Sequence, residues 1–371
     1  MLTKIELDAW KATTPDTENV EVVNRLIDQF GLSQMKKEEL DRYDHHFFRR
    51  KIIIAHRDFG IVTERIKTKK PFIQMTGVAC SGPMHMGHKM SIDLFLFLKK
   101  MGARSYLAAA DIDAYVSRSD KTVPSLEKAK EYAVDNITDC IALGVDPKDI
   151  YAQSRKEQRY YEFAFELTKK FTFNTLFSIY GEDYDPGKNS ANMLQYADIL
   201  HQQLREFGGP MPSITGIGIE QDPHARAVRD IAARLPYNFV MPSFIYFAFQ
   251  QGLQQGKKMS SSDPATAIFL SDTPEEAAKK IRNAFSGGRD TLAEHKKLGG
   301  IPEIDRAYQI LKYHHPDDKY VNELYDRFKS GEITSGELKD EAIKFIGEFL
   351  KKHNEKAKRA RPIAEKIVHG R

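Results

Sequence analysis

The stretch PFIQMTGVACSGPMHMGHKMSIDLFLFLKKMGARSYLAAA, residues 71–110, decides the fold. PFIQMTG (71–77) predicts a short apolar strand, and RSYLAAA (104–110) predicts a second one. Between them, MGHKMSIDLFLFLKKMG predicts a helix that ends at Gly102. A crossover helix between two apolar runs implies neighbouring parallel strands, so we expect a doubly wound α/β sheet with its ligand at the carboxyl ends of the strands.

The same βα alternation returns further along the chain. ITGIGIE (214–220) predicts a strand, DPHARAVRDIAARL a helix, and YNFVMPSF (237–244) a third strand-like run. Residues 122–205 predict helices with aromatic-rich faces, which we interpret as an insertion before the sheet resumes. A Rossmann-like domain over residues 71–272 is therefore expected.

The two ends of the chain differ from this central part. Residues 1–70 mix polar and apolar positions without strand alternation, and we interpret them as a helical N-terminal appendage. From residue 273 to residue 371 the pattern is helical and charged, which predicts a separate C-terminal helical domain. The last 21 residues, KKHNEKAKRARPIAEKIVHGR, are strongly basic and could either touch RNA phosphates or form a solvated helix face.

Composition limits the class of protein. Apolar residues make up 41% of the 371 positions, which agrees with a globular enzyme, and the formal charge of +4 does not by itself indicate a nucleic-acid partner. The two cysteines, Cys80 and Cys140, exclude a disulfide framework or a cysteine zinc cluster. The apolar run near residues 92–98 is far short of a membrane span and no leader opens the sequence, so we expect a cytoplasmic protein without a membrane partner.

Two stretches carry chemistry. In HMGH (85–88), a glycine lies between two histidines at the start of the predicted helix, where backbone N–H groups can bind phosphate. The alternative is that the histidines only cap the helix. In QQGKKMSSSDP (254–264), a lysine followed by three serines suits a polyphosphate, and the alternative is a polar surface loop. A parallel sheet would bring both stretches to one edge.

The two stretches together show a specific resemblance to a known family. HMGH paired with KMSSS resembles the signature of class I aminoacyl-tRNA synthetases, in which both motifs clamp ATP. HHFFRRKIIIAHRDF with KKPF, GIEQDPHARAVRDIA, and AFSGGRDTLAEHKKLGG (284–300) are similar to the tryptophanyl-tRNA synthetase family in its archaeal and eukaryotic branch. The resemblance spans residues 45–300.

The resemblance implies a reaction and its partners. Tryptophan and ATP would form tryptophanyl-adenylate, and the aminoacyl group would pass to the 2′-OH of the terminal adenosine of tRNA(Trp). Mg²⁺ would be held mainly by phosphates and water, so no protein metal ligand is expected. The family also implies a homodimer formed through the insertion, and it makes residues 273–371 an anticodon-binding domain.

The resemblance also implies roles for individual residues. His85 and His88 would donate to phosphate oxygens, Gly87 would admit adenosine close to the backbone, and Lys258 would follow charge onto the leaving pyrophosphate. The other implied contacts are Met259, Ser260, Ser261, Gly218 and Glu220 for ATP; Asp113, Gln195, Asp198 and Gln221 for tryptophan; and Arg289 and Asp290 for tRNA.

The amino acid specificity is the least direct inference. The eukaryotic branch reads the indole N–H with a tyrosine and a glutamine, but Met75 and Ala108 stand at those positions here. Asp198 could accept the indole N–H, although tyrosyl-tRNA synthetases place an aspartate there to bind the phenol. A tyrosyl-tRNA synthetase is therefore one alternative. Two others are a non-catalytic tRNA-binding paralogue and a small-molecule nucleotidyltransferase. The absence of a tyrosine at position 75 and the SGGRDT stretch favour tryptophan.

Overall fold

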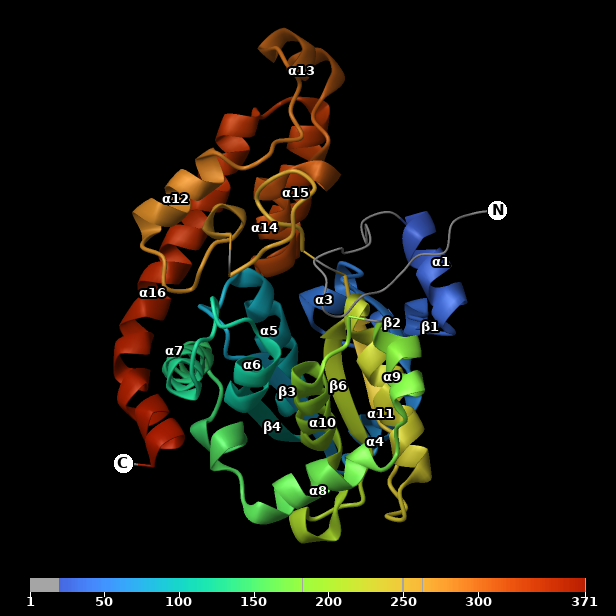
Figure 1. Cartoon of the computed structure of the whole chain (residues 1–371). Coiled ribbons are helices and arrows are strands. Elements are labelled where there is room, and N and C mark those ends of the chain that lie inside the picture. The colour runs from blue at the N-terminus through green and yellow to red at the C-terminus, as the bar shows by residue number, and fades with distance from the viewer. Residues whose placement is uncertain (1–19, 182, 249, 262, 371) are drawn as a thin grey trace.

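The computed structural model describes residues 20–181, 183–248, 250–261 and 263–370. Its centre is a seven-stranded sheet in the order β1-β2-β7-β6-β3-β4-β5 (Figure 1). The strands β7, β6, β3, β4 and β5 pair in parallel, and β2 and β1 extend one edge in antiparallel orientation. The strands β1 to β7 are Ser33–Gln34, Ile53–Arg57, Phe72–Ala79, Ala103–Ala110, Ile150–Ala152, Ser213–Gly218 and Ser243–Phe247. The predicted doubly wound sheet is confirmed, with an antiparallel edge added to it.

The unit β3–α5–β4 has the structure that the sequence predicts. The helix α5 spans Met86–Lys100, and β3 and β4 pair in parallel over their whole length. Gly102 follows α5 with a φ of +99°, a backbone conformation that glycine adopts without a steric penalty, so the chain turns there into β4. The buried amide of Gln74 donates to Phe95 O at 2.8 Å and to Ser105 Oγ at 2.7 Å, which satisfies this polar group inside the unit.

Both faces of the sheet are covered by helices. In β7, Phe244 and Tyr246 pack into one apolar core, and the alternating Ile245 and Phe247 pack into another. The first core includes residues of α1 (Val20–Phe30), α8 (Gln158–Thr168), α10 (Pro186–Leu200) and α11 (Asp222–Arg234). The second includes residues of α2 (Lys37–Leu40), α3 (His46–Arg49), α4 (Phe59–Lys67) and α5.

Three predictions about strands need correction. Residues 53–57 form β2, which pairs with β7. The run of isoleucines shows no alternation, and the register of β2 shifts between Ile53 and Ala55, so these two residues pack into different cores. Residues 150–152 form β5 inside the predicted insertion, and three residues are too few to show a period. β7 begins at Ser243 rather than Tyr237, since Asn238 has a φ of +51° and Pro242 lacks an N–H to donate.

The C-terminal part is helical, as predicted. It contains α12 (Pro274–Arg282), α13 (Leu292–Leu298), α14 (Arg306–His314), α15 (Asp318–Ser330) and α16 (Ser335–His369). The long helix α16 runs back along α12 and α7 (Leu126–Leu143), beside the sheet (Figure 1). His353 of α16 contacts Asp139 of α7 at 2.9 Å, and one continuous core joins the two helices. The limits at residues 70 and 272 stay predictions about domain organisation.

Two further helices lie near the carboxyl ends of the strands, α6 (Asp111–Ser117) directly after β4 and α9 (Phe173–Tyr180) before α10. None of the helices formed by the described residues has the length and apolar character needed to cross a membrane.

Candidate active site

The HMGH and KMSSS stretches open onto one cavity of about 410 Å³ at the carboxyl ends of β3, β4 and β6. HMGH contributes His85, Gly87 and His88 to its lining, and Lys258 and Met259 come from the KMSSS stretch. The third serine of that stretch, at position 262, lies outside the described residues. The other predicted site residues on this lining are Asp113, Gln195, Asp198, Gly218, Glu220 and Gln221.

Backbone hydrogen bonds explain why segments so distant in the sequence meet. Met86 N donates to Ile268 O, and Leu270 N donates to Met84 O, each at 3.0 Å. The hydroxyl of Ser261 also donates to Pro83 O at 2.9 Å. The segment after KMSSS therefore pairs with the turn before α5, and this pairing fixes Lys258 opposite the start of that helix.

His85 and His88 both cap α5. Nδ1 of His85 accepts the N–H of Gly87, and Nδ1 of His88 accepts the N–H of His85, each at 3.1 Å. Burial lowers the pKa of His88 to about 4 and that of His85 well below its ordinary value, so both rings are neutral at pH 7. With Nδ1 used as an acceptor, the single ring proton must lie on Nε2. Capping thus prepares each histidine as an Nε2–H donor, and the two alternatives raised by the sequence are compatible.

Gly87 is a position where a side chain would disturb this arrangement. A Cβ added there would lie 3.0 Å from Cε1 and Nδ1 of His85. We expect Gly87→Ala to displace that ring and to lower kcat/KM for ATP by about 10–100-fold. The expected measurement is ATP–pyrophosphate exchange, with thermal unfolding measured in parallel.

Gly60→Ala is the matched control, because Gly60 also lies in a helix and an added Cβ would meet nothing within 4 Å. It should leave exchange unchanged. Unchanged exchange in Gly87→Ala would show that the position of the His85 ring does not matter for ATP.

Lys258 and Glu220 are charged groups that face one another across the cavity. Burial lowers the pKa of Lys258, and the carboxylate of Glu220 opposes this. Oε2 of Glu220 is buried without a hydrogen-bond partner among the described residues. Burial raises the pKa of this carboxyl group. An acceptor in that condition suits a pair of ribose hydroxyls. A Cβ at Gly218 would lie 2.4 Å from the same Oε2, so a side chain there would push this carboxyl group out of its place.

The other end of the cavity holds two carboxyl groups, that of the half-buried Asp113 and that of the buried Asp198. Burial, with the nearby charge of Asp198, raises the pKa of Asp113 to about 7. Burial also raises the pKa of Asp198 to about 6, even though three side chains donate to it. Met75, Ile199 and Ile217 add apolar atoms to the lining of the same cavity. An apolar slot with acidic groups at its ends suits a flat ring that carries an N–H and an ammonium.

The sequence analysis missed two residues here. Arg118 follows α6, lines the cavity and acts electrostatically on both Asp113 and Lys258. The available signal was its position two residues after the segment ADIDAYV (110–116), which contains the predicted Asp113. Gln153 lies behind the cavity and contacts Asp198, and nothing in its local sequence marks it.

The structure places Arg289 and Asp290 away from this cavity, in the exposed turn before α13. Arg289 Nε donates to Gly299 O at 2.9 Å, and a Cβ at Gly287 would lie 2.1 Å from Ile301 O. The SGG part of SGGRDT is therefore shaped by packing. Asp290 is exposed, and the predicted tRNA contacts of both residues stay predictions.

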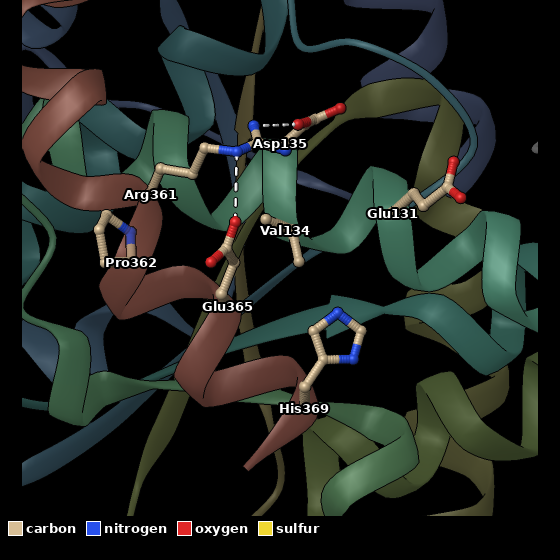
Figure 2. Close-up of a pocket in the computed structure, with 7 residues that line it drawn as sticks. All are labelled: Glu131, Val134, Asp135, Arg361, Pro362, Glu365 and His369. Carbon is tan, nitrogen blue, oxygen red and sulfur yellow. Dashed lines mark hydrogen bonds and ion pairs between the residues drawn. The ribbon is translucent and has the colours of Figure 1, made fainter. Parts of the chain in front are cut away.

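The basic C-terminal run lies on α16. A second cavity of about 830 Å³ is lined by residues of α16 and α7, and Figure 2 shows Arg361 between Asp135 and Glu365 there. Arg361 pairs with Asp135 at 2.8 Å and with Glu365 at 3.4 Å. This cavity contains neither the HMGH turn nor Lys258, and part of the basic run serves to attach α16 to α7.

Comparison with known proteins agrees with this geometry. Residues 67–351 match the family described as tRNA synthetases class I (W and Y). The chain belongs to that family. It is 41% identical to the tryptophan–tRNA ligase of Methanocaldococcus jannaschii over 377 aligned residues, which cover 99% of each chain.

Solved structures of this family show the same fold. The tryptophanyl-tRNA synthetase of Aeropyrum pernix superposes with a TM-score of 0.87 at 35% identity, covering 95% of this chain and 98% of that one. The enzyme of Plasmodium falciparum gives a TM-score of 0.80 at 30% identity, with 92% and 94% covered. The Rossmann-like class I fold is thereby confirmed.

Proposed function

We propose that this chain activates L-tryptophan with ATP and transfers it to the 2′-OH of the terminal adenosine of tRNA(Trp). The activity is that of a tryptophan–tRNA ligase, the name carried by its full-length relatives at 41% and 36% identity. The observation that carries the proposal is the single cavity that joins HMGH, Lys258 and the GIEQ segment. A non-catalytic paralogue would have no need to keep these groups together.

In the first step, a carboxylate oxygen of tryptophan attacks the α-phosphorus of ATP. The new bond joins that oxygen to phosphorus, and the bond to the bridging oxygen breaks, so pyrophosphate leaves. A carboxylate needs no general base at neutral pH, so the barrier falls through positioning and charge stabilisation. His85 and His88 donate from Nε2 to phosphate oxygens at the start of α5, whose dipole favours the same anion. Lys258 stabilises the charge that develops on pyrophosphate.

The remaining contacts hold the two substrates. Gly218 and Glu220 bind the ribose, with Met259, Ser260 and Ser261 completing the ATP site, and Gln195, Gln221 and Asp113 bind the substrate ammonium. Among the described residues there is no cluster of three or more His, Cys, Asp or Glu side chains that could hold a metal ion. Mg²⁺ would be held through the phosphates of ATP, where it would neutralise phosphate charge.

A pH dependence follows from Asp113. Because its pKa is raised to about 7, the carboxyl is ionised above that pH and protonated below it. The substrate ammonium binds the ionised form, so kcat/KM for tryptophan should fall about tenfold between pH 8 and pH 6. Exchange measured across this range tests the expectation. Asp113→Asn should reduce the fall to about twofold, the part that protonation of Asp198 with its pKa of about 6 causes, and a wild-type profile without a slope would contradict the role of Asp113.

Several further proposals rest on the family. Residues 273–371 would bind the anticodon arm, with Arg289 and Asp290 as base contacts and the basic part of α16 as a weak phosphate contact. A homodimer through the insertion is supported by the exposed rings of Phe165 and Phe173, which are 75% and 65% exposed. A purely monomeric species at micromolar concentration would contradict it.

The direct test is charging of a tRNA(Trp) transcript with labelled tryptophan. We expect charging that requires ATP and the 2′-OH of the terminal adenosine, so a transcript ending in 2′-deoxyadenosine should not be charged. The comparisons do not favour the tyrosine alternative, since the full-length relatives are tryptophan–tRNA ligases. Charging with tyrosine instead would overturn the proposal.

A further inference from the structure

Asp198 lines the substrate cavity, and three side chains donate to it from behind. The hydroxyls of Tyr151 and Tyr160 donate to Oδ1, each at 2.7 Å, and the amide of Gln153 donates to Oδ2 at 2.7 Å. Asp198 is 2% exposed, and Gln153 and Tyr160 are fully buried. The carboxylate is thus held in one orientation by donors that do not reach the cavity themselves.

Counting lone pairs shows what remains for a substrate. A carboxylate offers about four acceptor sites, two on each oxygen. The two tyrosine hydroxyls fill Oδ1, and Gln153 takes one site on Oδ2. One acceptor site on Oδ2 is left, which suits a single N–H donor.

The orientation of Gln153 is fixed by a second contact. Its Oε1 accepts the backbone N–H of Asp113 at 3.0 Å, so its NH₂ group must be the one that points at Asp198. Gln153 therefore links the carboxylate of Asp198 to the backbone of Asp113, and the carboxyl groups of these two residues lie at the amino-acid end of the cavity. One of these would read the ring of the substrate and the other its ammonium, so their spacing depends on this amide.

We infer that Gln153 is a positioning residue for amino acid selection, which holds Asp198 with one free acceptor for the indole N–H and sets its distance from Asp113. The inference rests on the proposed function. It also gives a reason for rejecting tyrosine: a phenol oxygen at this place would need a donor, and the hydroxyls of Tyr151 and Tyr160 spend their single protons on Asp198. A buried oxygen without a donor is unfavourable.

The test compares tryptophan with its analogue in which sulfur replaces the indole N–H, using amino-acid-dependent pyrophosphate exchange. The wild type should prefer tryptophan in kcat/KM by a factor of about 10–100. In Gln153→Met, which removes both amide contacts at similar volume, the KM for tryptophan should rise about tenfold with kcat changed less than about threefold. The preference over the sulfur analogue should fall towards one.

Tyr160→Phe repeats the test without touching Asp113, in case Gln153→Met does not fold, and should also reduce the preference for tryptophan over the analogue. Tyr43→Phe is the matched control, since the buried Tyr43 hydroxyl contacts Thr63 at 3.0 Å in another core. It should leave the preference unchanged.

The outcomes separate cleanly. A preference that stays at the wild-type value in Gln153→Met and in Tyr160→Phe would overturn the inference, even if stability falls. A wild type that uses both compounds equally would overturn it as well. Absence of tryptophan-dependent exchange in the wild type would instead overturn the proposed function.

Discussion

Lys258→Ala should lower kcat for ATP–pyrophosphate exchange by about 10²–10³-fold, the usual cost of removing one preorganised group that stabilises developing charge. The KM for tryptophan should change little, because Lys258 lies at the phosphate end of the cavity, opposite Asp113 and Asp198. Its interaction develops as charge moves onto the leaving pyrophosphate, so the loss should appear mainly in kcat.

Lys257→Ala is the matched control for this variant. Lys257 is the neighbouring lysine, is about half exposed and pairs with Asp263 at 3.1 Å. It should leave exchange within about twofold of the wild type, since exposed ion pairs contribute little. Undiminished adenylate formation in Lys258→Ala would show that the lysine does not act on the phosphates.

Asp222→Asn should lower the free energy of unfolding by about 3–5 kcal/mol, because it breaks a buried charge network. Asp222 is fully buried, and Arg57 of β2 donates to both of its oxygens, at 2.9 Å and 3.0 Å. The hydroxyl of Tyr246 in β7 donates at 2.6 Å, and Arg226 lies 3.0 Å away. The amide cannot balance two guanidinium groups, so β2, β7 and α11 would lose their common ion pair.

Urea unfolding would measure this loss. Asp230→Asn in the same helix is the control, because its pair with Arg234 is exposed and should contribute less than about 0.5 kcal/mol. An Asp222→Asn variant as stable as Asp230→Asn would mean that the network does not hold the antiparallel edge to the parallel sheet.

Much of the fold could be predicted because the sequence shows the apolar runs of the central strands and the helical pattern between them. The apolar runs of β3 and β4, the helix between them and the turn at Gly102 all follow from local pattern. β2 and β5 could not be predicted in this way. The pairing of β2 with β7 shifts register between Ile53 and Ala55, so two residues that a regular strand would place on one face pack into different cores, and the three residues of β5 show no period.

Some residues of the candidate site could likewise be predicted from the sequence, and others could not. HMGH and KMSSS are contiguous motifs, so their residues could be named before their meeting at one cavity was seen. Gln153 could not, because its importance lies in two contacts with residues 40 and 45 positions away. The sequence predicted the position of the two histidines but not their protonation state. The neutral state that makes Nε2 a donor depends on burial and on the hydrogen bonds of Nδ1 with backbone N–H groups.

The measurement that tests the central claim most directly is pyrophosphate exchange by the full chain with tryptophan and with tyrosine as alternative substrates. We predict ATP-dependent exchange with tryptophan, at a kcat/KM about 10²–10⁴-fold above that with tyrosine. Exchange driven by tyrosine, or no exchange with either amino acid, would contradict the assignment of this cavity to tryptophan activation.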